Sequence, residues 1–196
     1  MLFSTLGFDF RAEENEKLRG ANRKKSLEMI LDLAGFEFSP SEKELLCEKK
    51  NEIYLGLIKN IGRDDTIAGF IPFLEKTKSA GFKIGMGSSS RNAIRTIERL
   101  ELTHFFDTKI DANSVSQSKP DPTIYLNVSA HLDIQPENCL VFEDAENGIL
   151  AAKRAGMKVI GIGKNEQVEK ADLIFANFEG LLPETIVAAL KESTED

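Results

Sequence analysis

Three short segments of the sequence carry polar side chains whose spacing suits phosphoryl chemistry. In the first, a strand-like run ends in Ser88, Ser89 and Ser90, which Arg91 and Asn92 follow. Hydroxyl groups and free backbone amides at the amino end of a helix favour a bound phosphate. One serine could simply cap the next helix. Three serines followed by an arginine and an asparagine exceed what a cap requires, so this segment predicts a phosphate site.

The second segment contains a lysine on a loop that two prolines make rigid. Lys119 precedes Pro120, and Asp121 with Pro122 is typical of a helix start at which the aspartate is the cap. A lysine on a rigid loop can balance the anionic charge that builds up in a transition state. Taken alone, Lys119 could equally be an ordinary solvated side chain.

The third segment ends a buried apolar run, 139–142, with the adjacent carboxylates Glu143 and Asp144. Like charges repel unless a cation lies between them, and hard divalent cations prefer oxygen ligands. The pair therefore predicts a magnesium site. The alternative is that Asp144 caps the following helix.

Strands must bring these segments together, and the sequence after Thr66 predicts such an arrangement. Short apolar runs alternate with amphipathic helices, which indicates an α/β fold with a parallel sheet and helices on both faces. Ligands bind beyond the carboxyl ends of the strands in such a sheet. The expected strands are 83–87, 108–111, 139–142, 158–162 and 173–176, and the expected helices are 71–80, 91–100, 122–132, 145–155 and 183–191.

Residues 1–65 show a different pattern, which predicts a separate helical domain before an α/β domain at 66–196. Apolar residues recur at helical spacing over 24–34 and 41–61. The second helix has a start signal in residues 39–41, where Ser41 is followed three residues later by Glu44, as in a serine cap with its acid.

Composition narrows the class of protein. The 196 residues include 32 acidic and 25 basic side chains, so a net charge of -7 argues against a nucleic-acid partner. No apolar run approaches the ~20 residues that span a bilayer. The two cysteines, Cys47 and Cys139, form no metal or redox spacing. We expect a monomeric cytoplasmic protein that contacts neither nucleic acid nor membrane.

The three polar segments resemble the second, third and fourth motifs of the haloacid dehalogenase superfamily, whose members transfer phosphoryl groups through an aspartyl phosphate with magnesium. Within it the sequence is most similar to the beta-phosphoglucomutase family. The resemblance implies an α/β core with a helical cap, Mg²⁺ as cofactor, and interconversion of β-D-glucose 1-phosphate and glucose 6-phosphate through a bisphosphate. The alternatives are a sugar-phosphate phosphatase of the same superfamily and a non-catalytic remnant that binds phosphate esters. The similar stretches are 18–23, 26–34, 50–51, 88–92, 119–120 and 143–156.

The resemblance also implies roles for individual residues. Ser88 would hydrogen-bond the transferred phosphoryl group, and Lys119 would offset its charge. Asp144 would bind magnesium with Glu143 beside it. A mutase also needs a site for a second, non-reacting phosphate, because its bisphosphate intermediate binds in two orientations. The substrate-binding residues would be Gly20, Arg23 and Lys50 in the cap, with Ser89, Ser90, Arg91 and Asn92 in the core.

The first motif of the superfamily is missing from this sequence. That motif is a strand ending in two aspartates one residue apart, but Asp9 is followed by Arg11 at the second position. It would supply the nucleophile, the general acid-base, a magnesium ligand and a central strand. A sheet without that strand leaves backbone groups unpaired at ~1–3 kcal/mol each. We therefore expect this chain to be inactive as written. We expect that the motif is missing because of a late start codon or a shortened sequence, rather than because the natural protein lost it. A natural remnant and a strand supplied by another chain are the alternatives.

Overall fold

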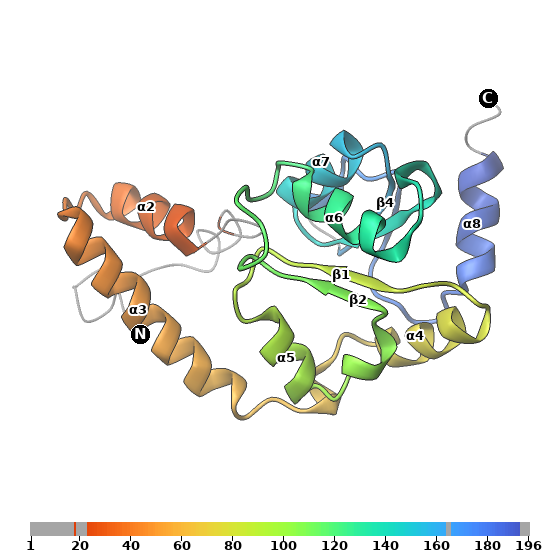
Figure 1. The fold of residues 1–196 in the computed structure, drawn as a ribbon, viewed down its shortest axis with the longest axis horizontal. Coiled ribbons are helices and arrows are strands. Elements are labelled where there is room, and N and C mark those ends of the chain that lie inside the picture. The colour runs from red at the N-terminus through yellow and green to blue at the C-terminus, as the bar shows by residue number, and fades with distance from the viewer. Residues whose placement is uncertain (1–17, 19–22, 164–165, 193–196) are drawn as a thin grey trace.

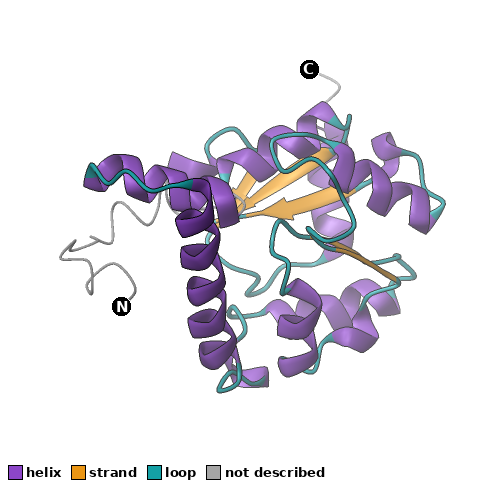
Figure 2. Ribbon diagram, turned by 60° about the vertical axis from the view of Figure 1, so that its left-hand side comes forward, coloured by secondary structure: helices purple, strands orange, loops and turns teal. Residues whose placement is uncertain are grey.

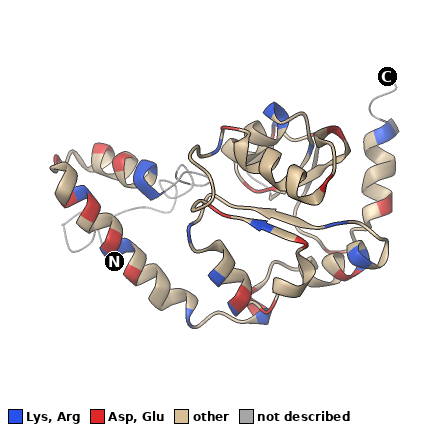
Figure 3. Ribbon diagram, in the orientation of Figure 1, with Lys and Arg blue, Asp and Glu red and all other residues tan. Residues whose placement is uncertain are grey.

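The computed structural model describes residues 18, 23–163 and 166–192. Two helices, α2 (Arg23–Ala34) and α3 (Pro40–Ile58), form an arm at one side of an α/β unit (Figure 1). Basic and acidic residues are interspersed along both helices of the arm (Figure 3). The two helices pack through a buried apolar cluster of Leu27, Ile30, Leu31 and Cys47.

The start of α3 differs from the sequence prediction. The cap is Ser39, whose Oγ accepts a hydrogen bond from the backbone N–H of Glu42 at 3.4 Å. The Glu42 carboxylate in turn accepts from the Ser39 backbone N–H at 2.8 Å. Pro40 takes the first helical position, which suits its fixed φ. The cap was therefore predicted correctly in type, but its assignment to Ser41 with Glu44 was wrong.

The α/β unit contains five strands, all close to the expected ranges. Every pairing is parallel: β1 with β2, β3 with β4, and β4 with β5. The expectation of an α/β fold with parallel strands is confirmed. The strands are β1 (Gly85–Gly87), β2 (Thr108–Ile110), β3 (Leu140–Glu143), β4 (Lys158–Ile162) and β5 (Leu173–Phe175).

β1 is shorter than the expected run 83–87 because an aspartate replaces part of its ladder. Asp107 accepts from the Ile84 N–H at 2.7 Å and donates its own N–H to the Ile84 carbonyl at 2.7 Å. Lys78 Nζ donates to the other carboxylate oxygen at 2.7 Å. The Lys78 hydrogen bond, followed by the one from Ile84, lowers the pKa of the Asp107 carboxyl. These contacts fix the amino end of β1.

Helices cover both faces of the strands (Figure 1). The neighbouring residues Val159 and Ile160 of β4 point to opposite faces. Val159 packs in the cluster beneath α6 (Thr123–Leu132) and α7 (Glu146–Arg154). Ile160 packs against Phe73 of α4 (Phe70–Ser79) and Ile186 of α8 (Pro183–Glu192). Further elements are α5 (Ala93–Arg99), η2 (Arg63–Asp65), η3 (Thr103–Phe105), η4 (Pro136–Asn138) and η5 (Glu166–Val168).

Helix α6 lies unusually close to β1. A Cβ built at Gly85 would be 2.4 Å from Val128 Cγ1, and one at Gly87 would be 3.3 Å from the ring of Tyr125. Only a residue without a side chain fits at Gly85 without displacing the helix. This close approach brings Tyr125 to the carboxyl end of β1.

The described strands form two sheets rather than one. One sheet contains β1 and β2, and the other has the order β3-β4-β5, as the two separate groups in Figure 2 show. Asp9 and Arg11 lie outside the described residues, so the expectation of a missing central strand stays a prediction.

Residues 59–69, which include η2, connect the arm to the α/β unit. The division into domains at 1–65 and 66–196 stays a prediction. Over the part of the chain that the structure describes, no helix combines the length and the apolar character needed to cross a bilayer.

Candidate active site

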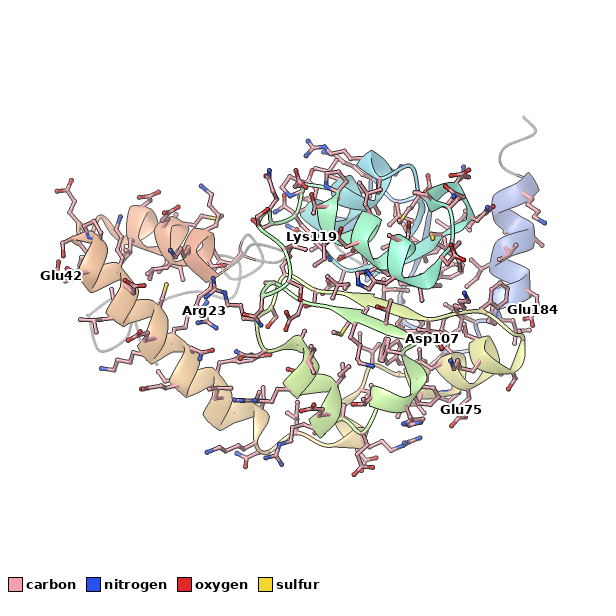
Figure 4. All side chains as sticks on the ribbon, in the orientation of Figure 1. Arg23, Glu42, Glu75, Asp107, Lys119 and Glu184 are labelled. Carbon is pink, nitrogen blue, oxygen red and sulfur yellow. The ribbon has the colours of Figure 1, made fainter. Side chains whose placement is uncertain are left out.

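The three polar segments meet at one cavity of about 1180 Å³. Its lining includes Ser88 after β1, Lys119 before α6 and Glu143 at the end of β3. Arg23 and Lys50 of the arm line the same cavity. Figure 4 shows Arg23 and Lys119 on the sides of the arm and of the α/β unit that face each other. Residues from both parts of the chain therefore form the site.

Lys119 is the centre of a buried polar network. Its ammonium donates to the Gly87 carbonyl at 3.1 Å, to the Tyr125 hydroxyl at 2.8 Å and to Oε1 of Glu143. The ammonium also lies 4.5 Å from the centre of the Tyr125 ring, within range of a cation–π attraction. Only 6% of the side chain is exposed. The alternative of an ordinary solvated lysine is therefore wrong.

Tyr125 joins this network from α6 and was not among the predicted site residues. Its hydroxyl donates to Oε1 of Glu143 while accepting from Lys119. Burial raises the pKa of the Tyr125 phenol well above its usual value, and the carboxylates of Glu143 and Asp144 raise it further. The phenol thus stays a hydrogen-bond donor. In the sequence it is only one more large residue on the buried face of a helix.

The position of the Glu143 carboxylate depends on a glycine in α7. A Cβ at Gly148 would lie 2.1 Å from Cδ of Glu143 and 2.2 Å from its Oε1. Real Cβ atoms do not approach this closely, so any larger residue would displace the carboxylate. Gly148 therefore makes room for the ion pair between Glu143 and Lys119.

The serine segment forms a tight loop between β1 and α5. Ser88 Oγ accepts from the Ser90 N–H at 3.2 Å, and Ser90 Oγ accepts from the Asn92 N–H at 3.1 Å. Both hydroxyl protons remain able to donate. The Oγ of Ser89 is buried and has no hydrogen-bond partner among the described residues. Since buried hydroxyls are normally paired, this one suits a ligand oxygen in the cavity. Arg91 is exposed at the same opening.

One asparagine of the arm connects the arm to the serine loop. Asn51 Oδ1 accepts from Arg23 Nη2 at 2.7 Å and from Asn92 Nδ2 at 2.7 Å. Further along α3, the hydroxyls of Tyr54 and Thr96 lie 3.4 Å apart. Asn51 was not predicted as a site residue. It holds the Arg23 guanidinium against the core side of the cavity.

Lys50 lies beside this connection and is half-buried in the cavity lining. Burial lowers the pKa of its ammonium; the nearby Cys47 opposes this shift, and the positive charge of Arg23 adds to it. An anionic ligand near both cations would relieve this repulsion. Gly20, the remaining predicted arm residue, lies outside the described residues.

With this geometry established, comparison with known proteins decides the family. The model of the haloacid dehalogenase-like hydrolases matches residues 8–162. The chain belongs to this family. The resemblance read from the sequence is therefore confirmed.

The relatives of this haloacid dehalogenase-like protein include a mutase and a phosphatase. Beta-phosphoglucomutase of Bacillus subtilis strain 168 is 39% identical over 167 residues, which cover 84% of this chain and 74% of that protein. The phosphorylated carbohydrates phosphatase of Thermotoga maritima is 29% identical over 190 residues, 95% of this chain and 85% of that protein. The crystal structure of beta-phosphoglucomutase from Clostridium difficile is 34% identical with a TM-score of 0.92, covering 100% of this chain and 88% of that one.

The two carboxylates of the acidic pair predicted to bind magnesium lie in different environments. Glu143 is committed to Lys119 and Tyr125, whereas Asp144 is exposed at the cavity. No group of three histidines, cysteines or acids suited to a metal ion occurs within the described residues. Mg²⁺ usually keeps several waters and takes only one or two carboxylates together with substrate phosphate. Asp144 suits such an ion, while Glu143 is engaged with Lys119 and Tyr125 through Oε1. The place of both carboxylates in a magnesium site stays a prediction.

Proposed function

We propose that this site serves the magnesium-dependent interconversion of β-D-glucose 1-phosphate and glucose 6-phosphate. The observation that most supports a mutase is the contact of Arg23 and Asn92 with Asn51. It holds an arm cation beside the serine loop, where a second phosphate would bind. A planar guanidinium is well suited to phosphate because it donates two parallel hydrogen bonds. The 39% identity to beta-phosphoglucomutase of Bacillus subtilis over 84% of the chain supports the same proposal.

In this proposal the two ends of the substrate meet different groups. Ser88 donates to the phosphoryl group in transfer, and Lys119 offsets its charge from the buried network. Asp144 would hold Mg²⁺, which would supply charge neutralisation of that phosphoryl group. Arg23 and Ser89 bind the other phosphate, and Lys50, Ser90, Arg91 and Asn92 complete the substrate site.

The nucleophile is not among these residues. The sequence contains no pair of aspartates one residue apart, so we propose that the chain as written binds sugar phosphates without turnover. The 196-residue chain would then be a phosphate-ester binding protein that lacks the aspartate nucleophile needed for turnover.

A sugar-phosphate phosphatase is the second candidate. It is favoured by the similarity of nearly the whole chain to the phosphorylated carbohydrates phosphatase. A fructose-1-phosphate phosphatase of Escherichia coli K12 also matches at 39% identity, over 40% of this chain. A phosphatase needs one phosphate site and water, so binding of the second phosphate separates the two candidates.

Calorimetric titration with glucose 6-phosphate tests the proposed site without requiring turnover. We expect tighter binding of glucose 6-phosphate than of glucose or inorganic phosphate. Ser89→Ala should weaken it at least about tenfold, since a hydrogen bond to a charged group contributes ~1.5–3 kcal/mol. Ser114→Ala is the matched control, because Ser114 is exposed and lies outside the cavity lining. Equal effects of the two substitutions, or no binding at all, would contradict the proposal.

A further inference from the structure

The N–H donors of the Lys119 ammonium are all used inside the protein. A protonated lysine carries three such donors and no acceptor. Within the described residues they meet three acceptors, which are the Gly87 carbonyl at 3.1 Å, the Tyr125 hydroxyl at 2.8 Å and Oε1 of Glu143. The side chain is almost fully buried, so water has little access to it. An anion that contacts this ammonium must therefore displace one of the three acceptors.

The three acceptors differ in what they lose when the ammonium turns away. Glu143 would become a buried carboxylate without its counter-ion, which is the costliest loss. The Gly87 carbonyl can only accept, so it would lose this hydrogen bond and gain nothing. The Tyr125 hydroxyl accepts from Lys119 but also donates to Oε1 of Glu143. It keeps this donation after the ammonium has turned away, so its bond to Lys119 costs least to give up.

The ring of Tyr125 holds the ammonium in place during such an exchange. Lys119 Nζ lies 4.5 Å from the ring centre, and a cation–π attraction of this kind uses no particular N–H. The ammonium can therefore turn one N–H away from the hydroxyl without leaving its position. Both side chains line the cavity, so a ligand oxygen can approach them.

We propose that Tyr125 is a positioning residue that holds one N–H of Lys119 and releases it to an oxygen of the bound phosphoryl group. Before binding, the Tyr125 hydroxyl both donates and accepts. After binding, the phosphoryl oxygen accepts the N–H, and the hydroxyl only donates, to Glu143. Every N–H and O–H bond stays intact, so no proton is transferred. The inference rests on the proposed function, in which Lys119 offsets the charge of the phosphoryl group in transfer.

Ultraviolet resonance Raman spectroscopy tests this directly, because the doublet of tyrosine bands depends on whether the hydroxyl donates, accepts or does both. The chain contains two tyrosines and no tryptophan, so Tyr54→Phe leaves Tyr125 as the only such signal. The ligand is glucose 1,6-bisphosphate, which presents a phosphate to Lys119 in either orientation. We expect the doublet to change from that of a donating and accepting hydroxyl to that of a hydroxyl that only donates. The change should saturate with the dissociation constant that calorimetry gives.

Tyr125→Phe in the same Tyr54→Phe background provides a second measurement. Phenylalanine keeps the ring and removes the hydroxyl, so one N–H of Lys119 no longer has its acceptor in the protein. Calorimetry should show that the bisphosphate binds about threefold to tenfold more tightly, since binding no longer gives up a neutral hydrogen bond. A tyrosine that only maintained the structure of the site would weaken binding when replaced. Ser114→Ala, at an exposed position outside the cavity lining, is the matched control and should leave the affinity unchanged.

The outcomes separate this inference from the proposed function. An unchanged doublet with the bisphosphate bound would overturn the inference alone, as would equal or weaker binding by a folded Tyr125→Phe protein. The Raman measurement decides the matter even if Tyr125→Phe fails to fold, because it retains Tyr125. No bisphosphate binding by the Tyr54→Phe protein would overturn the proposed function, and this inference with it.

Discussion

Replacement of Gly148 by alanine tests whether the Glu143 carboxylate is held as the structure shows. In most helix positions this substitution stabilises a protein by up to ~1 kcal/mol, because alanine has the higher helix propensity. At position 148 the new Cβ would lie 2.1 Å from Glu143 Cδ. The carboxylate would have to move, and with it the contacts to Lys119 and Tyr125.

The expected net effect is a loss of about 1–3 kcal/mol in the free energy of unfolding, from overpacking and weakened buried hydrogen bonds. Urea denaturation monitored by circular dichroism measures it. The matched control is Gly56→Ala in α3, where a Cβ would meet nothing within 4 Å. The control should gain stability by up to ~1 kcal/mol. If Gly148→Ala gained as much as the control, the close approach of Glu143 to α7 would be refuted.

Two further predictions follow from contacts outside the Lys119 network. Asn51→Ala should weaken glucose 6-phosphate binding, because Arg23 and Asn92 lose their shared acceptor; calorimetry should show no such change for Asn60→Ala, an exposed residue at the end of the arm. Asp107→Asn should destabilise the fold near neutral pH, since the lowered pKa of Asp107 means that its carboxylate stabilises the fold above the ordinary value of 3.8. Urea denaturation at a series of pH values should show the free energies of unfolding of the two proteins converging as the pH falls below that value. A difference in the free energy of unfolding that stays constant with pH would contradict this reasoning.

The sequence was sufficient to predict the parts of the site that lie at the ends of regular elements. Ser88, Lys119 and Glu143 each follow or precede an apolar run of recognisable period, so the parallel topology was enough to bring them together. Strand ends were less accurate, because side chains compete with the ladder there. Asp107, which binds the backbone of Ile84, is such a case.

Residues whose roles depend on contacts across the fold could not be predicted in this way. Tyr125 belongs to an apolar helix face, and Asn51 to a helix covered with polar residues. Gly148 looks like a weak helix residue until the carboxylate packed against it is seen. The two carboxylates 143 and 144 are adjacent in sequence, yet one is paired with Lys119 while the other is exposed.

The central claim is that the arm and the core together form a second phosphate site, as a mutase requires. Calorimetric comparison of glucose 1,6-bisphosphate with glucose 6-phosphate tests it most directly. The account predicts that the chain binds the bisphosphate at least about tenfold more tightly, as one added charge-assisted contact implies. Arg23→Ala should abolish this preference, while Arg95→Ala, at an exposed position outside the cavity, should keep it. Equal affinities for the two ligands, or a preference that survives Arg23→Ala, would contradict the claim.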